Sequence, residues 1–255
     1  MTIDEQIEYL KKNKRIVFNQ ISEDEAKTIL LKYGYINVIS PFKYIFADKK
    51  NGIPVKVNGR HIYSRDVEFK EYYDNYLQER KQYGRLYLNI SKFEVKFNSI
   101  VTHELMLYYN INSDVQFNKF VNTIISNVHA SSYRLSVQTH MINELNCFSS
   151  KMKNYESIYI FMDRLSLGST ITLFRCCDLQ IRKQIFSDLL KNDATVKYTD
   201  FSSFDDFLFR VVPIRNCVFH NNSLTILKRY FDIKNKLLRT RSDQRKYSNI
   251  IKRLL

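Results

Sequence analysis

The sequence predicts an all-α protein, a helical bundle with an N-terminal helical extension and one small β-hairpin. Three observations favour this fold class. The 255 residues include only five Gly and three Pro, so few residues interrupt helices. Apolar side chains recur at helical spacing in mid-chain, and one Asn-Gly pair lies between two short alternating runs. With 44% hydrophobic residues, the chain can bury one sizeable core and carry a small appended domain.

The N-terminal segment predicts two helices. Residues 3–13 place acids before lysines, which is the order that the helix dipole favours. Ser22 and Glu25 form a capping box for a helix over 22–33, which Gly34 ends.

The next segment changes character. Residues 35–46 predict a short helix or a buried loop, because Pro41 opposes a long helix. Asn58 and Gly59 suit the two positive φ angles of a type I′ turn, so we expect a β-hairpin within residues 51–65.

From residue 66 onward the pattern is helical. Residues 66–82 and 86–109 form two long helices, or one interrupted near Gly84, and Ser91 with Glu94 predicts a capped start. A buried stripe at helical spacing comprises Phe93, Phe97, Ile100, Val101 and Leu105. Further helices are expected over 114–127, 131–149, 156–164, 169–176, 178–191, 203–211, 213–221, 223–237 and 242–254.

We expect three parts: residues 1–65 as the extension with the hairpin, 66–237 as the main helical domain, and 238–255 as a basic terminal helix.

The chain is strongly basic, with 40 Lys and Arg against 26 Asp and Glu and a net charge of +14. Such a charge attracts polyanions, and 18 Tyr suit stacking on unpaired bases, although a merely solvated basic surface is the alternative. Residues 228–255 hold ten Lys or Arg against two Asp, so this segment is the best candidate for phosphate contacts; the alternative is a helix that only keeps the protein soluble. The candidate RNA-binding residues are Lys228, Arg229, Lys234, Lys236, Arg239, Arg241, Arg245 and Lys246.

Cysteine usage and hydropathy indicate a cytoplasmic protein. The four Cys form no C-x-x-C pair and no signal peptide opens the chain, so we expect reduced, buried thiols. No stretch approaches the ~20 apolar residues of a membrane span, so no membrane partner is expected.

Several common chemistries lack their motifs. The chain has no GxxxxGK, GxGxxG or GxSxG sequence. His103 and Glu104 lack the second His of a zinc-protease helix, and no acidic pair has the pattern of a two-metal nuclease. We therefore expect no metal site and no cofactor.

Residues 212–224, VPIRNCVFHNNSL, carry the candidate chemistry. Pro213 suits the first turn of a helix. On that helix Asn216 and His220 share one face, while Arg215 lies about 140° from His220 and reaches around with its long side chain.

These residue types suit metal-free cleavage of RNA, because the ribose 2′-OH is an internal nucleophile. His220 can take a proton from the 2′-OH or give one to the leaving oxygen. Arg215 can stabilise the charge on phosphorus, and Asn216 can orient His220 or a phosphate. The structural alternative pairs Arg215 with an acid and buries His220 in the core. Arg134 and His140 fit a looser spacing without the Asn, and we interpret them as a polar helix face.

Several further stretches agree in order and approximate spacing with one known family. They are IDEQIEYLKKNKRIVFN with SEDEAKTILLKYGYINVISPF, LNISKFEVKFNSIVTHEL, RLSLGSTITLF and IRNCVFHNN. In these features the chain resembles the Abi family of bacterial abortive-infection proteins of the AbiD/AbiF type. That family belongs to the HEPN (higher eukaryotes and prokaryotes nucleotide-binding) superfamily. The resemblance covers most of residues 3–225. It departs from the family at Asn98, Leu167 and Ile39-Ser40-Pro41, where the family has Arg, Phe and Ser-Gly-Tyr.

The resemblance implies an all-α HEPN bundle that forms a homodimer, with two Arg-Asn-x3-His helices across one cleft. It implies a metal-independent endoribonuclease in phage defence, with Arg215, Asn216 and His220 as catalytic residues. Glu94 is then the acid of the core helix, and Asn221, next to His220, is a second supporting residue. Because the same signature occurs in RNA-guided type VI CRISPR nucleases, a structured small RNA is an expected partner.

Two other functions stay open. One is an RNA-binding module that holds a small RNA and does not cut it alone. The other is the toxin of a toxin–antitoxin pair, whose neighbouring gene would encode the neutralising partner.

Overall fold

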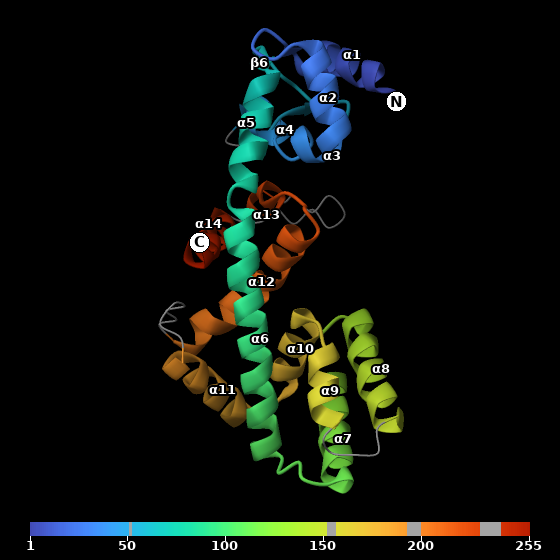
Figure 1. Cartoon of the computed structure of the whole chain (residues 1–255), viewed down its shortest axis with the longest axis vertical. Coiled ribbons are helices and arrows are strands. Elements are labelled where there is room, and N and C mark those ends of the chain that lie inside the picture. Colours follow the sequence, from blue (N-terminus) through green and yellow to red (C-terminus); the bar gives the residue numbers. More distant parts are fainter. Residues whose placement is uncertain (51–52, 152–156, 193–199, 230–240) are drawn as a thin grey trace. The chain divides into compact units, whose positions relative to one another are not determined.

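The computed structural model describes residues 1–50, 53–151, 157–192, 200–229 and 241–255 (Figure 1). These residues are mostly helical, and each strand among them is two residues long. The predicted all-α fold class is therefore confirmed.

Two compact units divide the chain. The first comprises residues 1–87, 213–253 and Leu255, and the second comprises residues 88–212 and Leu254. Three helices contribute to both units: α6 (Tyr83–Tyr108), α12 (Phe201–Phe219) and, through its last residue, α14 (Arg241–Leu254). The three-part division expected from the sequence stays a prediction.

The N-terminal part of the first unit consists of short helices beside α5 (Figure 1). Ser22 caps α2 and forms the predicted box with Glu25, and Gly34 ends this helix with a φ of +82°. The 35–46 segment forms two helical turns on either side of Pro41. The helices are α1 (Ile3–Lys14), α2 (Glu23–Tyr33), α3 (Tyr35–Val38), α4 (Lys43–Phe46) and α5 (Phe69–Arg80). The core between them includes Leu10, Val38, Phe42, Phe69 and Tyr72.

The predicted β-hairpin is present. Strands β4 (Lys56–Val57) and β5 (Arg60–His61) pair antiparallel around Asn58 and Gly59, whose φ angles are +50° and +76°. Two further strand pairs were not predicted, because two-residue strands leave no alternating pattern to detect. They are β2 (Lys49–Lys50) with β3 (Ile53–Pro54), antiparallel, and β1 (Ile16–Val17) with β6 (Val67–Glu68), parallel.

The C-terminal part adds α13 (Leu224–Arg229) and α14 (Arg241–Leu254). In α14 the side chains of Tyr247, Ile250 and Ile251 are buried, while Arg245 and Lys246 are exposed. The terminal helix is therefore amphipathic.

Aromatic side chains hold the second unit together. Phe97 packs against Phe174 and Phe204 with ring centroids 5.6 and 6.2 Å away, and Phe93 meets Phe207 edge-on at 5.0 Å. Of the predicted stripe on α6, Phe93, Phe97, Val101 and Leu105 are buried, and Ile100 is half-buried. The remaining helices are α7 (Asp114–Ala130), α8 (Leu135–Lys151), α9 (Ser157–Arg164), α10 (Leu167–Cys176) and α11 (Leu179–Asn192).

Two predicted helix starts are wrong. Ser91 and Glu94 do not cap a helix start, because they lie inside the continuous α6. The separate helices expected over 203–211 and 213–221 are the single helix α12, with Pro213 in its interior. Proline removes one backbone hydrogen bond there. The fully buried side chains of Val211 and Ile214 on either side favour continuing the helix despite this loss.

The cysteines are free, as expected, but one expectation is wrong. Cys176 and Cys177 are buried and Cys217 is half-buried, whereas Cys147 is exposed. Across the described ranges, none of the helices has the length and apolar character needed to cross a bilayer.

Lys14 is an unusual member of the first unit's core, with only 6% of its surface exposed. Its Nζ donates a hydrogen bond of 3.1 Å to the Tyr63 hydroxyl and lies 5.1 Å from the centre of the Tyr63 ring. Burial, and then the charge of Lys43, lower the pKa of Lys14 to about 8. The folded protein therefore disfavours the charged ammonium.

This burial predicts a dependence of stability on pH. The unfolded chain, with an ordinary lysine pKa of 10.5, binds more protons than the folded chain between pH 8 and 10.5. The free energy of unfolding should therefore rise with pH from about 8. Near pH 9 the rise should end, because burial raises the pKa of Cys176 and Cys177, so these thiols lose their protons first in the unfolded chain. Replacing Lys14→Met should raise stability at pH 7 by about 1–2 kcal/mol and remove this rise.

Thermal unfolding followed by circular dichroism between pH 7 and 9.5 checks this expectation. Lys12→Met, an exposed position on the same helix, is the matched control and should keep the wild-type slope. A Lys14→Met protein that is less stable at pH 7 and keeps that slope would contradict it.

Candidate active site

The C-terminal end of α12 holds the three predicted catalytic residues in a defined turn. The helix ends at Phe219, and Asn221 follows with a φ of +54°, in the left-handed region. The Asn221 N–H donates to the Val218 carbonyl at 3.4 Å, and the Asn222 N–H donates to the Cys217 carbonyl at 2.8 Å. These two bonds form a Schellman motif, in which Asn often replaces Gly at the left-handed position.

Buried and exposed residues alternate along this helix end. Ile214 and Val218 are buried and anchor it, Arg215 is half-buried, and Asn216 and His220 are exposed. The His220 N–H donates to the Asn216 carbonyl at 3.1 Å, so the two residues lie one turn apart, as the sequence predicted. Because the His220 side chain is exposed, the alternative of a core histidine is wrong.

An aromatic ring supports the Arg215 guanidinium. Its central carbon lies 4.3 Å from the centre of the Phe219 ring, which is a cation–π distance. Phe219 in turn stacks on Tyr87 from α6, with ring centroids 4.4 Å apart and a 27° angle between planes. The guanidinium carries a positive charge, so the helix end that exposes Asn216 and His220 also holds a cation.

Arg80 at the end of α5 fixes the turn that follows His220. Its two terminal nitrogens donate to the side-chain oxygen of Asn221 at 3.1 Å and to the Asn221 carbonyl at 2.6 Å. The same guanidinium lies 4.4 Å from the Tyr83 ring centre. Asn221, predicted as a supporting residue, therefore has a structural contact through both of its oxygens.

Glu79 and Tyr83 hold the next residues. The Glu79 carboxylate accepts hydrogen bonds from the Ser223 hydroxyl at 2.9 Å and from the Thr225 N–H at 3.0 Å. The Tyr83 hydroxyl lies within hydrogen-bonding range of the Asn222 carbonyl and accepts from the Leu224 N–H at 3.3 Å. Burial, and then the Glu79 charge, raise the pKa of Tyr83, so its hydroxyl keeps its proton.

The contacts of Glu79, Arg80 and Tyr83 with the segment after α12 were not predicted from the sequence. Arg80 and Asn221 are 141 positions apart, and no local pattern links α5 to the segment after α12. The sequence shows only a Tyr shortly after a Glu-Arg pair, and this pattern also suits an ordinary solvent-facing helix end.

Glu94, the predicted core-helix acid, lies in the second unit, whereas Arg215 and His220 belong to the first. Its carboxylate accepts a hydrogen bond of 3.1 Å from the Leu167 N–H, at the start of α10. A carboxylate at a helix N-terminus is favoured by the helix dipole. Asn98, where the family pattern has Arg, donates to the Met162 carbonyl at 2.8 Å and so holds α6 to the end of α9.

Those predicted RNA-binding residues that the structure describes lie on two helices. Lys228 and Arg229 end α13, and Arg241, Arg245 and Lys246 lie on α14. Arg245 and Lys246 are exposed. The predicted residues Lys234, Lys236 and Arg239 lie outside the described residues. Arg134 and His140, interpreted as a polar helix face, are both exposed, but only His140 lies on α8, because Arg134 precedes the first residue of that helix.

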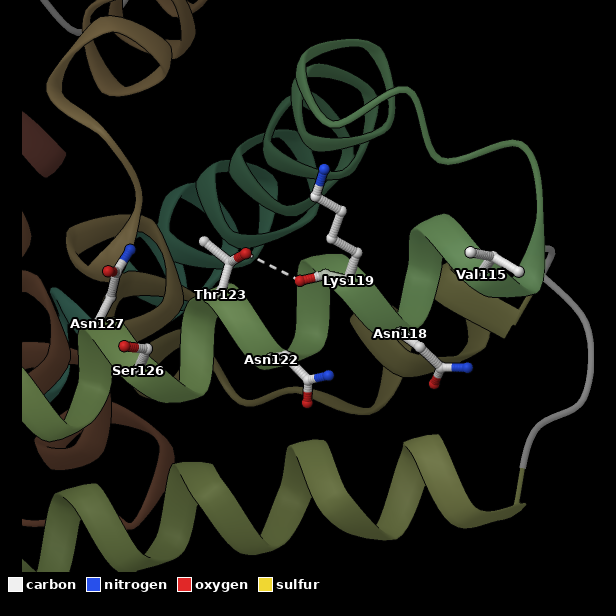
Figure 2. Close-up of a pocket in the computed structure, with 7 residues that line it drawn as sticks. All are labelled: Val115, Asn118, Lys119, Asn122, Thr123, Ser126 and Asn127. Atoms are coloured by element: carbon white, nitrogen blue, oxygen red, sulfur yellow. Dashed lines mark hydrogen bonds between the residues drawn. The ribbon is translucent and has the colours of Figure 1, made fainter.

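An open groove elsewhere in the second unit offers different chemistry (Figure 2). All of its lining residues come from α7, and Thr123 donates to the Lys119 carbonyl at 2.8 Å. Its lining includes amides, hydroxyls and one lysine, and it holds no His, Asp or Glu side chain. The lining residues are Val115, Asn118, Lys119, Asn122, Thr123, Ser126 and Asn127.

The fold and the site define a helical protein with an Arg-Asn-x3-His motif at a helix end, where the Asn and the His are exposed. Residues 28–225 match the family model described as Abi-like protein. Because this match spans more than half of the chain, the protein belongs to the Abi-like family. Membership suggests a role in abortive infection, a form of defence against phage. Neither the curated proteins nor the solved structures contain a match.

The left-handed residue after His220 makes a pair of substitutions informative. Asn221→Gly and Asn221→Ala both remove the side-chain acceptor of Arg80, but only alanine opposes a positive φ. We expect the alanine variant to be about 1 kcal/mol less stable than the glycine variant. Denaturant unfolding of the two proteins measures this difference, and equal midpoints would show that the turn is not left-handed.

Proposed function

We propose that this protein is a HEPN-type, metal-independent endoribonuclease acting in abortive infection, with Arg215, Asn216 and His220 as its catalytic residues. The observation that carries this proposal is the exposed His220, held at an anchored helix end one turn from Asn216. An Arg215 guanidinium supported on Phe219 lies on the same helix end. The proposed reaction requires no cofactor.

The reaction follows from these groups. An imidazole of His220 takes the proton of the ribose 2′-OH while the 2′-oxygen attacks the neighbouring phosphorus. Arg215 stabilises the extra negative charge of the pentacovalent transition state. The bond from phosphorus to the 5′-oxygen then breaks, and that oxygen receives a proton as it leaves. The products are a 2′,3′-cyclic phosphate and a 5′-hydroxyl end.

A proton must be removed at one oxygen and supplied at another, and each chain contributes one motif histidine. A second copy of the chain would provide the second imidazole in a composite site. We therefore expect a dimer when RNA is present, and light scattering of the RNA complex measures it. A complex that contains a single chain would contradict the composite site.

The basic helix α14 is proposed as a phosphate-contacting surface. Its exposed Arg245 and Lys246 lie beside the buried Tyr247, so the helix can dock through its apolar face and present cations to RNA. A structured small RNA is the partner that the family resemblance suggests.

The decisive test replaces the motif histidine. In the presence of EDTA, wild-type protein should cleave a labelled RNA, and His220→Ala should lose activity by roughly 100-fold or more. His140→Ala is the matched control, because His140 is also an exposed helical histidine. It should cleave like the wild type.

Three results would count against the proposal. Unchanged cleavage by His220→Ala would exclude His220 as a catalytic residue, and cleavage abolished by EDTA would exclude the metal-free mechanism. If the wild type and His220→Ala bind RNA equally and neither cleaves it, the RNA-binding module replaces the enzyme.

A further inference from the structure

We infer that Tyr87 stacks on an unpaired nucleobase adjacent to the phosphate that Arg215 binds. This inference rests on the proposed function and specifies one part of the substrate that the site would hold. Tyr87 is a positioning residue in this account, because it contacts a base and not the reacting atoms.

The ring of Tyr87 is exposed to solvent and also held by a stacking partner. Tyr87 exposes 51% of its surface although its ring stacks on Phe219 with centroids 4.4 Å apart. Because stacking on Phe219 already restricts the Tyr87 side chain, little more conformational entropy is lost when a base stacks on the exposed part of the ring. Both residues belong to the first unit, Tyr87 on α6 and Phe219 on α12.

The same Phe219 ring positions the cation. Arg215 lies 4.3 Å from its centre and Tyr87 lies 4.4 Å from it, so the guanidinium and the exposed tyrosine ring are near each other. Proteins that bind single strands combine cations for the backbone with aromatic rings for the bases, and this site has both.

The surface beside Tyr87 is open. Gly84, one helical turn earlier on α6, is exposed, and a Cβ placed there would have no atom within 4 Å. Residues three positions apart share a helix face. A base stacked on Tyr87 would therefore meet no side chain from Gly84.

The chemistry favours unpaired RNA over a duplex. A base inside a double helix has both faces covered by its neighbours, so it must leave the stack before an aromatic side chain can cover it. We expect cleavage next to an unpaired nucleotide, with little dependence on which base it is, because every base has a π-face.

The sequence contains no Trp, and this makes a direct test possible. Tyr87→Trp introduces the one tryptophan of the protein, and adding His220→Ala keeps the RNA intact during measurement. An unpaired oligoribonucleotide should change the tryptophan emission with the same midpoint as a gel-shift titration, and a blunt duplex of equal length should not. Tyr159→Trp is the matched control, because Tyr159 is 57% exposed and lies in the second unit. Its emission should stay unchanged.

Kinetics with otherwise wild-type protein provide a second readout. Tyr87→Ala should raise the KM for unpaired RNA about tenfold with a smaller change in kcat, and Tyr87→Phe should restore the wild-type KM, because stacking needs the ring and not the hydroxyl. Circular dichroism checks that the alanine variant is folded, and if it is not, the Tyr87→Trp emission decides.

The outcomes separate this inference from the proposed function. If the RNA binds and is cleaved, but the emission of Tyr87→Trp and the KM of Tyr87→Ala are unchanged, Tyr87 has no stacking role and the ribonuclease proposal stands. If the wild type neither binds nor cleaves RNA, both fail.

Discussion

The hydrogen bonds between Glu79 and the segment after α12 determine where the candidate site can form. A chain that leaves a helix must find partners for its backbone N–H groups. Here the carboxylate of Glu79 accepts from Thr225, and the hydroxyl of Tyr83 accepts from Leu224. Arg80 adds two bonds to Asn221. Without these contacts the last turn of α12 would fray, and the position of His220 would not be defined.

Phe219 connects two parts of the site that have different chemistry. Its ring supports the Arg215 guanidinium and stacks on Tyr87. Arg215 and Phe219 are one helical turn apart, so this contact follows from their spacing. Tyr87 comes from another helix and could be placed only by tertiary packing. A cation and an aromatic surface are thereby combined around one ring, which is an arrangement suited to a nucleotide.

Glu94 shows how a residue marked by a family pattern can have a structural explanation. Its carboxylate meets the first N–H of α10, where the helix dipole stabilises negative charge. Nearby, Asn98 binds the Met162 carbonyl and so ties α6 to α9. These contacts explain an acid and a polar residue at these positions through the packing of the second unit. A catalytic part for Glu94 is not needed to account for them.

The sequence by itself determined the features that depend on near neighbours: the helical periodicity, the Ser22 cap, the Asn58-Gly59 turn and the Asn216–His220 face. Each involves residues within four positions, where spacing alone fixes geometry. Only the tertiary structure decided the burial of Lys14, the continuation of α12 through Pro213 and the Glu79–Arg80–Tyr83 anchor. Their energies come from partners far away in the sequence, which local patterns cannot identify.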